Sequence, residues 1–210
     1  METSLEKREL RRRVWYLLKE RGVALPPFPI EGRIPNFKGA REAAERLRKL
    51  ELWKRARVVL VNPDSAQRYV RELALRDGKL LVVASPKLRT GYLLLDPKSL
   101  RGREKEASTI RGAFKFGKRI GLDVLSQRGM SIDLVVEGSV AVDLDGNRLG
   151  KGGGYGDREI AEVRKFFRDV VVVTLVHDLQ VVERVPTTEF DQKVDLIVTP
   201  TRIVRCRKGI

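Results

Sequence analysis

A chain of 210 residues, 42% of them apolar, is long enough to bury one substantial core, and this composition excludes a disordered protein. The formal net charge of +15, from 43 Lys and Arg against 28 Asp and Glu, predicts an anionic partner such as a phosphate, a polyanionic cofactor or a nucleic acid. The longest apolar run, residues 170–176, is too short to span a bilayer, so no membrane-spanning role and a cytoplasmic location are expected.

Two further features of the composition concern the temperature at which the protein works and its cysteine chemistry. Charged residues of both signs make up 34% of the chain, which is typical of proteins from hot environments, where ion-pair networks are favoured. The single cysteine, Cys206, excludes an internal disulfide, and we expect no reactive role for it because no histidine lies nearby in the sequence.

Helical and strand patterns alternate along the chain. Apolar residues at helical spacing predict an amphipathic first helix over residues 5–20, and a cluster of prolines at 26–29 then excludes regular structure. The expected further helices lie at 40–53, 66–76, 107–119, 121–127 and 156–167, and the expected strands at 58–62, 79–84, 91–95, 134–137, 139–143, 170–176 and 196–199. Residues 205–210 are expected to form a loose tail.

This alternation predicts one α/β domain. Short β-branched runs separated by helices are typical of a mainly parallel sheet that is covered on both faces. We therefore expect a three-layer α/β/α sandwich. No internal repeat and no linker rich in Gly and Ser divides the chain, so residues 1–210 are predicted to form a single domain.

The most informative stretch is a glycine-rich segment that follows a predicted strand and turn and precedes a predicted helix. It reads Arg-Leu-Gly-Lys-Gly-Gly-Gly-Tyr-Gly-Asp-Arg over residues 148–158. Glycines let successive backbone N–H groups point into one concavity, and the positive end of the next helix adds to the attraction for an anion. The segment predicts a phosphate site, with Arg148 and Lys151 as mobile cations at its rim; the alternative is a flexible loop tip.

Two other loops carry candidate ligand-binding residues. Asn36, Phe37 and Lys38 combine hydrogen-bond donors with one aromatic ring, which suits a planar ligand such as a pterin, although they could equally lead into the next helix. The loop after the strand predicted at 79–84 contains Pro86, Lys87, Arg89 and Thr90, which could meet an anionic group or could form an ordinary charged loop. His177, the only histidine, ends a predicted strand, where either a catalytic base or a structural role fits.

Three motifs resemble those of the 5-formyltetrahydrofolate cyclo-ligases, also called methenyltetrahydrofolate synthetases. The glycine segment is similar to the family's signature loop, whose usual pattern ends Gly-Tyr-Tyr-Asp-Arg, with Gly156 in place of the second tyrosine. Residues 185–200 resemble the closing segment, with a proline, an acidic pair and Val-Asp before the last strand. Residues 7–11 fit the opening Lys-x-x-Leu-Arg.

Four further motifs resemble a divergent branch, the methenyltetrahydrofolate synthase domain-containing proteins. They lie at residues 33–39, 86–91, 174–182 and 199–202, so the resemblance runs along nearly the whole chain. The fold that the resemblance implies is of the NagB/RpiA/CoA transferase type. In the animal members of this branch an RNA-recognition domain follows.

The resemblance implies an ATP- and Mg²⁺-dependent reaction in which the formyl oxygen of 5-formyltetrahydrofolate is phosphorylated and the 5,10-methenyl product forms. It implies Arg148 and Lys151 as catalytic cations, Asp157 and Asp191 as magnesium ligands, and Tyr155 as a residue shared by nucleotide and substrate. The implied nucleotide-binding set is Lys7, Arg11, Arg148, Gly150, Lys151, Gly152, Gly153, Gly154 and Tyr155.

Each of these assignments has a structural alternative. The Asp157 carboxylate could simply interact with the positive end of the dipole of the helix in whose first turn it lies, and Asp191 could cap a loop. Lys7 and Arg11, one helical turn apart, could form a solvated basic face, and the Tyr155 ring could pack the loop against the core.

Three functions therefore remain from the sequence. The first is a cyclo-ligase-like enzyme that acts with ATP on a formylated folate or a related pterin. The second is a nucleotide- or folate-binding protein without turnover, which the missing tyrosine favours. The third is an RNA-binding protein, which the net charge favours although no RNA-recognition, KH or zinc motif is present.

Overall fold

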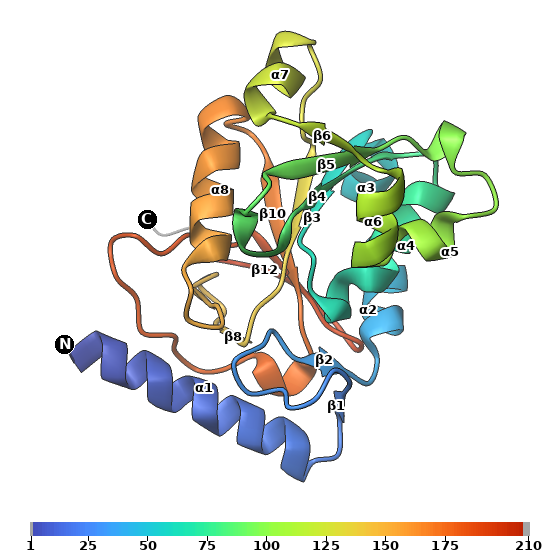
Figure 1. Ribbon diagram of the computed structural model, residues 1–210. Coiled ribbons are helices and arrows are strands. Elements are labelled where there is room, and N and C mark those ends of the chain that lie inside the picture. The colour runs from blue at the N-terminus through green and yellow to red at the C-terminus, as the bar shows by residue number, and fades with distance from the viewer. Residues whose placement is uncertain (1, 208–210) are drawn as a thin grey trace.

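The computed structural model describes residues 2–207 as a central sheet with helices on both faces (Figure 1). The helices are α1 (Glu2–Glu20), α2 (Ala40–Arg48), α3 (Glu51–Arg55), α4 (Arg68–Arg76), α5 (Glu104–Ala107), α6 (Ile110–Phe116), α7 (Leu122–Gln127) and α8 (Tyr155–Phe166). Short 3₁₀ turns are η1 (Ser65–Gln67), η2 (Pro86–Leu88), η3 (Pro97–Ser99) and η4 (Asp178–Gln180). None of these helices is both long and apolar enough to cross a membrane.

The sheet has eight strands in the order β12-β11-β10-β7-β3-β4-β5-β6. Its strands are β3 (Val58–Val61), β4 (Leu80–Ala84), β5 (Tyr92–Leu95), β6 (Lys118–Ile120), β7 (Leu134–Glu137), β10 (Val171–Leu175), β11 (Leu196–Val198) and β12 (Ile203–Arg205). The five strands from β11 to β4 are parallel to one another, whereas β12, β5 and β6 pair antiparallel at the edges. The predicted three-layer α/β/α fold with a mainly parallel sheet is confirmed.

Burial explains why the central strands form. Every residue of β3 and β7 is buried, because helices cover both faces of a parallel sheet. Helices α2, α3, α4 and α6 pack on one face, and α7 and α8 pack on the other, as Figure 1 shows. Two separate apolar clusters therefore lie on the two sides of the sheet.

The first helix lies across one end of the sheet instead of covering a face. Its apolar residues Leu10, Val14 and Leu18 form a third cluster with loop residues such as Val140 and Leu149. Figure 1 shows α1 running beneath β8 (Ala141–Val142), which pairs with β9 (Arg148–Leu149) in a small hairpin. A second small pair, β1 (Ala24–Leu25) with β2 (Asn36–Phe37), lies in the segment that follows α1.

Several predicted boundaries were wrong. The helix predicted at 40–53 divides into α2 and α3 because Leu50 adopts an extended backbone and begins α3. The helix predicted at 107–119 ends earlier, because Gly117 has an extended backbone. A Cβ at Gly117 would lie only 2.5 Å from Ala113 O. Residues 118–120 then form β6.

The structure also differs from the predictions for residues 139–143 and for the C-terminal tail. The strand predicted at 139–143 is the short β8, which belongs to the hairpin with β9 and not to the main sheet. The tail predicted at 205–210 begins inside β12, where Arg205 pairs with Leu196, and Cys206 N donates to Asp195 O at 3.0 Å. Residues 208–210 lie outside the described part of the chain.

Candidate functional site

The site lies at the carboxyl ends of the central strands. The strands β3 and β7 are neighbours in the centre of the sheet. The chain adds β4 next to β3 on one side, and it adds β10 and then β11 next to β7 on the other side, so the strand order reverses between β3 and β7. Open α/β sheets bind ligands at such a switch point because the loops after the two strands diverge and leave a crevice. A cavity there is lined by residues 62–64 after β3, by Ser85, Lys87 and Leu88 after β4, and by residues 137–138 at the end of β7.

The glycine loop (residues 148–158) forms one wall of this crevice. Gly152 and Gly154 have φ of 112° and 65°, values that favour glycine over residues with a side chain, and Gly154 is the N-cap of α8. The strand β9 of the hairpin supplies the first two residues of the loop, and α8 begins within it, at Tyr155. The sequence thus positions a run of backbone N–H groups at the positive end of a helix of 12 residues, which favours an anion.

Arg148 holds the base of the loop. Its side chain is buried, donates to Gly138 O at 3.1 Å and forms an ion pair with Asp157 at 2.9 Å. Burial opposes the charge of the guanidinium, but Glu137 and Asp157 outweigh it and raise the pKa of Arg148. The prediction of a mobile cation at the rim is wrong for this residue, because it is fixed beneath the loop.

An outer cavity of about 720 Å³, its open mouth included, lies between the glycine loop and α1. Lys7 and Arg11 line it, which brings the predicted nucleotide-binding residues of α1 to the loop. Arg11 Nε donates to Gly150 O at 2.7 Å, and burial lowers the pKa of Arg11 although Asp191 and Asp157 act in the opposite direction. The alternative of a merely solvated basic face is therefore disfavoured.

Both predicted magnesium ligands also line the outer cavity. Asp157 Oδ1 accepts from Arg148 and from Gln192 N at 3.1 Å. Asp191 forms an ion pair with Lys7 and accepts from Thr188; burial raises its pKa, but these partners outweigh burial and lower it. Among residues 2–207, no group of three or more His, Cys, Asp or Glu side chains is arranged to hold a metal ion.

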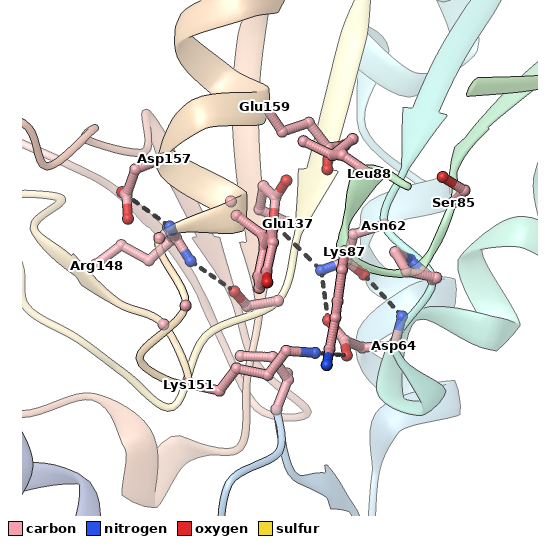
Figure 2. Close-up of a pocket in the computed structure, with 18 residues that line it drawn as sticks. Asn62, Asp64, Ser85, Lys87, Leu88, Glu137, Arg148, Lys151, Asp157 and Glu159 are labelled. Carbon is pink, nitrogen blue, oxygen red and sulfur yellow. Dashed lines mark hydrogen bonds and ion pairs between the residues drawn. The ribbon is translucent and has the colours of Figure 1, made fainter. Parts of the chain in front are cut away.

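An inner cavity of about 520 Å³, again including its mouth, lies on the other side of the glycine loop (Figure 2). Its lining includes four carboxyl groups, of Asp64, Glu137, Asp157 and Glu159, and the amide of Asn62. Asn62 Nδ2 donates to Asp64 at 3.0 Å and to Glu137 at 3.2 Å, and Lys151 Nζ bonds to Asp64 at 3.0 Å. Lys151 thus reaches from the loop across the cavity to the segment after β3.

Two buried carboxyl groups, those of Glu137 and Glu159, also line the inner cavity. Burial is the largest cause that raises the pKa of Glu137 to about 7, against the opposing charge of Arg148. Burial and the neighbouring charge of Glu137 raise the pKa of Glu159 well above its ordinary value. The inner cavity is therefore acidic in composition but not fully ionised.

Of the predicted substrate-binding residues, only Tyr155 lines one of the two cavities. Tyr155 lines the inner cavity, with the Arg158 guanidinium 4.7 Å from the centre of its ring. Phe37 is fully buried in the core, and Asn36 bonds to the backbone of Pro26, so these two residues hold the β1–β2 segment together. Three predicted residues, Asn36, Phe37 and Lys38, and the exposed Arg89 line neither cavity, whereas Lys87 and Leu88 of the same loop as Arg89 line the inner one.

His177 has a structural role in this arrangement. Its ring Nδ1 accepts from the backbone N–H of Leu179 at 3.1 Å, and the backbone N–H of His177 donates to Gln180 Oε1 at 2.7 Å. These two bonds cap η4. Burial lowers the pKa of His177, in agreement with a neutral ring that accepts a hydrogen bond. The ring also meets Phe37 edge to face, with centroids 6.0 Å apart.

Sequence reasoning missed the acidic lining of the inner cavity. Asn62 and Asp64 follow a buried strand, and Glu137 ends one, which is the position where open α/β sheets place functional side chains. That signal was available for all three. Glu159 carries no such signal, because only the packing of α8 brings it to the cavity.

The fold and site define a three-layer α/β/α protein whose glycine loop separates two cavities. The model of the 5-formyltetrahydrofolate cyclo-ligase family matches residues 3–200. The chain belongs to this family.

Curated relatives are similar over most of the chain. The methenyltetrahydrofolate synthase domain-containing protein of Mus musculus is 40% identical over 97% of this chain and 56% of its own length. The Homo sapiens protein of the same name is 37% identical over 95% of this chain and 53% of its own length. The chain thus spans about half the length of these relatives.

Solved structures agree with the fold. The 5,10-methenyltetrahydrofolate synthetase of Aquifex aeolicus has a TM-score of 0.59 and 22% identity, over 97% of this chain and 94% of that chain. The 5,10-methenyltetrahydrofolate synthetase of Mycoplasma pneumoniae has a TM-score of 0.55 and 14% identity, over 91% and 97% of the two chains.

Proposed function

We propose that the chain converts 5-formyltetrahydrofolate, or a related formylated pterin, to the 5,10-methenyl form with consumption of ATP. One observation carries the proposal: two cavities of different charge share the glycine loop as a common wall. Arg148, Gly150, Gly154 and Asp157 line both cavities. A phosphoryl donor on the basic side and a neutral acceptor on the acidic side would meet at this wall.

The outer cavity suits the triphosphate. Lys7 and Arg11 supply cationic groups, and the glycine backbone at the start of α8 supplies fixed donors, which favour the charge that develops on a transferring phosphoryl group. Ile34, Leu88 and Tyr155 line the inner cavity and offer apolar surface, so we assign the folate ring to that side.

Magnesium fits the outer cavity as a cation with few protein ligands. It takes one or two carboxylates and completes its shell with phosphate oxygens and water, so Asp157 and Asp191 would be sufficient to hold it. When bound, it would neutralise phosphate charge. Lys7 and Arg148, which pair with these carboxylates, fix them in place.

The γ-phosphoryl group passes to the formyl oxygen and ADP leaves. N10 then attacks the activated carbon, and inorganic phosphate departs with the formyl oxygen and takes up the N10 proton, so the reaction balances. Arg148, buried under the loop, stabilises the negative charge near both cavities.

The test is the absorbance of the 5,10-methenyl chromophore after mixing the full chain with 5-formyltetrahydrofolate, Mg²⁺ and ATP. An increase that requires ATP supports the proposal. ATP binding without an increase would instead support the second function, a nucleotide- or folate-binding protein without turnover. The comparisons give no support to the RNA alternative.

Replacement of Lys7 by methionine tests the assignment of the outer cavity. Lys7→Met removes a cation that faces the loop while it keeps the apolar stem, so the KM for ATP is expected to rise about tenfold or more, with a smaller change in the KM for the folate. Lys19→Met, near the far end of α1, removes an exposed cation that pairs with Glu31 and is the matched control. Equal effects of the two variants would contradict the assignment.

A further inference from the structure

The loop that joins β4 to β5 contributes a cation, Lys87, to the lining of the inner cavity. Figure 2 shows the Lys87 side chain extending into the cavity on the same side as Lys151 and Asp64. The lining has two other cations, and both are paired: Arg148 with Asp157, and Lys151 with Asp64. Within residues 2–207 the Lys87 ammonium forms neither an ion pair nor a hydrogen bond, so it is available to an anionic ligand.

The backbone of this loop holds Lys87 in a strained conformation. Lys87 and Leu88 have φ of 59° and 53°, in the left-handed region that residues with a side chain rarely adopt. Ser85 enforces the turn: its N–H donates to Gly91 O at 2.9 Å, and its carbonyl accepts from Leu88 N at 2.8 Å. The Ser85 hydroxyl also accepts from Thr90 N at 3.0 Å. Strain of this kind persists only where surrounding contacts determine it, and it is concentrated at sites that hold ligands.

The proposed reaction brings negative charge to this side of the glycine loop. The phosphoryl group leaves the outer cavity and stays on the formyl oxygen, on the side of the folate ring, until phosphate departs. Arg148 and Lys151 cannot give this group their full charge, because each also holds a carboxylate. The Lys87 ammonium has no such competitor among the described residues, and it offers three N–H donors to phosphate oxygens.

We propose that Lys87 and Lys151 form a phosphate-binding site on the inner face of the glycine loop, in which Lys87 holds the phosphoryl group after its transfer. The ligand class is a phosphate ester, and inorganic phosphate, the product released there, fits the same site. The strained loop fixes the ammonium before the phosphoryl group arrives, and such preorganised charge is what stabilises a developing anion. The identity of the ester rests on the proposed function, whereas the binding of inorganic phosphate does not.

Replacement of Lys87 by methionine tests the role of the ammonium in turnover. Lys87→Met is expected to lower kcat for the 5,10-methenyl product about 10- to 100-fold. The KM values for ATP and for the folate should change less than about threefold, because Lys87 meets the phosphoryl group only after its transfer. Lys87→Arg keeps a cation and should recover part of the rate. Lys98→Met removes an exposed lysine that lines neither cavity and is the matched control.

Replacement of Lys87 by glycine separates the binding role from a structural one. Glycine adopts a positive φ without strain, so Lys87→Gly should raise the urea midpoint of unfolding above that of the wild type. It also removes the ammonium, so kcat should fall as far as in Lys87→Met. A lysine with only a structural role would show no loss of rate in a variant that is more stable.

Inorganic phosphate is the probe that requires no reaction. Calorimetric titration is done with the full chain carrying Lys7→Met, which weakens phosphate binding in the outer cavity. Addition of Lys87→Met to this chain is expected to lower the affinity for phosphate about tenfold, whereas addition of Lys98→Met should leave it unchanged.

The outcomes separate this inference from the proposed function. Phosphate binding that weakens with Lys87→Met supports the site even if no 5,10-methenyl product forms, in which case the proposed reaction alone fails. Product formation with an unchanged kcat in Lys87→Met overturns the site and leaves the reaction standing. A phosphate affinity that does not depend on Lys87, or no phosphate binding by the Lys7→Met chain, also overturns the site.

Discussion

Gly156 shows how one residue determines the state of the site. The usual family pattern has a tyrosine here, and a Cβ at this position would lie 2.7 Å from Arg148 Nη2 and 3.0 Å from its Cζ. The guanidinium therefore occupies the space next to the glycine backbone. The sequence alone reveals the missing tyrosine, but only the folded chain shows that a buried arginine packs against this position.

Replacement of Gly156 by alanine is expected to destabilise the protein by about 1–3 kcal/mol, because the new methyl group displaces the Arg148 guanidinium. Urea unfolding of the purified variant measures this change. In an Arg148→Ala background the same replacement meets no guanidinium, and alanine should then stabilise α8 by about 0.5–1 kcal/mol relative to glycine. An equal effect in both backgrounds would show that the guanidinium does not pack there.

At the scale of elements, burial decided which strands could be predicted. The strands β3, β4, β7, β10 and β11 consist of apolar runs that are buried on both faces, and the sequence predicted them within one or two residues. The missed strands β6 and β12 lie at the sheet edges, and their Lys118, Arg119 and Arg205 are exposed. Edge strands form because a neighbour offers backbone groups, which leaves no apolar pattern in their own sequence.

The same distinction applies to the site. The glycine loop was predicted because its conformation depends on local glycines, and the approach of Lys7 and Arg11 followed from the resemblance. The burial of Glu137 and Glu159 depends on how α8 packs against β7, which is a tertiary property. Phe37 was predicted as a ligand contact because it lies in a polar loop, yet the fold turns its ring into the core.

The turn η4 depends on His177, and its removal is expected to affect stability and not catalysis. His177→Ala should lower the free energy of unfolding by about 1–2 kcal/mol, from the lost cap and the lost edge-to-face contact with Phe37. His177→Asn keeps a side-chain acceptor and should recover part of the loss. Urea unfolding and the 5,10-methenyl assay are measured together; a drop in kcat at unchanged stability would indicate a catalytic base instead.

For the whole molecule, the buried carboxyl pair makes stability depend on pH. Both groups have raised pKa values, that of Glu137 being about 7, whereas glutamate in an unfolded chain titrates at about 4.3. Between these values the folded protein binds protons that the unfolded chain has lost, so the pair's contribution to stability falls as the pH rises. Asp191 and Asp178, whose pKa values are lowered, act oppositely and lose their contribution only as the pH falls through the acidic range.

Replacement of Glu159 by glutamine is expected to remove part of the pH dependence of stability. The variant should be more stable than the wild type, and the gain should grow from mildly acidic to slightly alkaline pH, by up to about 1.4 kcal/mol per pH unit for one proton. Urea unfolding at several pH values measures the gain, with Glu162→Gln as the control. A gain that is the same at every pH would contradict a raised pKa at Glu159.

The glycine loop that separates the two cavities has a consequence for how ligands influence each other. The same backbone segment lines both cavities. A molecule that orders this segment from one cavity therefore lowers the conformational entropy that a second molecule loses on binding in the other. Thermodynamic reciprocity makes this effect mutual: if the nucleotide tightens the binding of the ring, the ring tightens the binding of the nucleotide by the same factor. If the proposed function holds, nucleotide and ring are therefore expected to bind cooperatively across this short glycine segment.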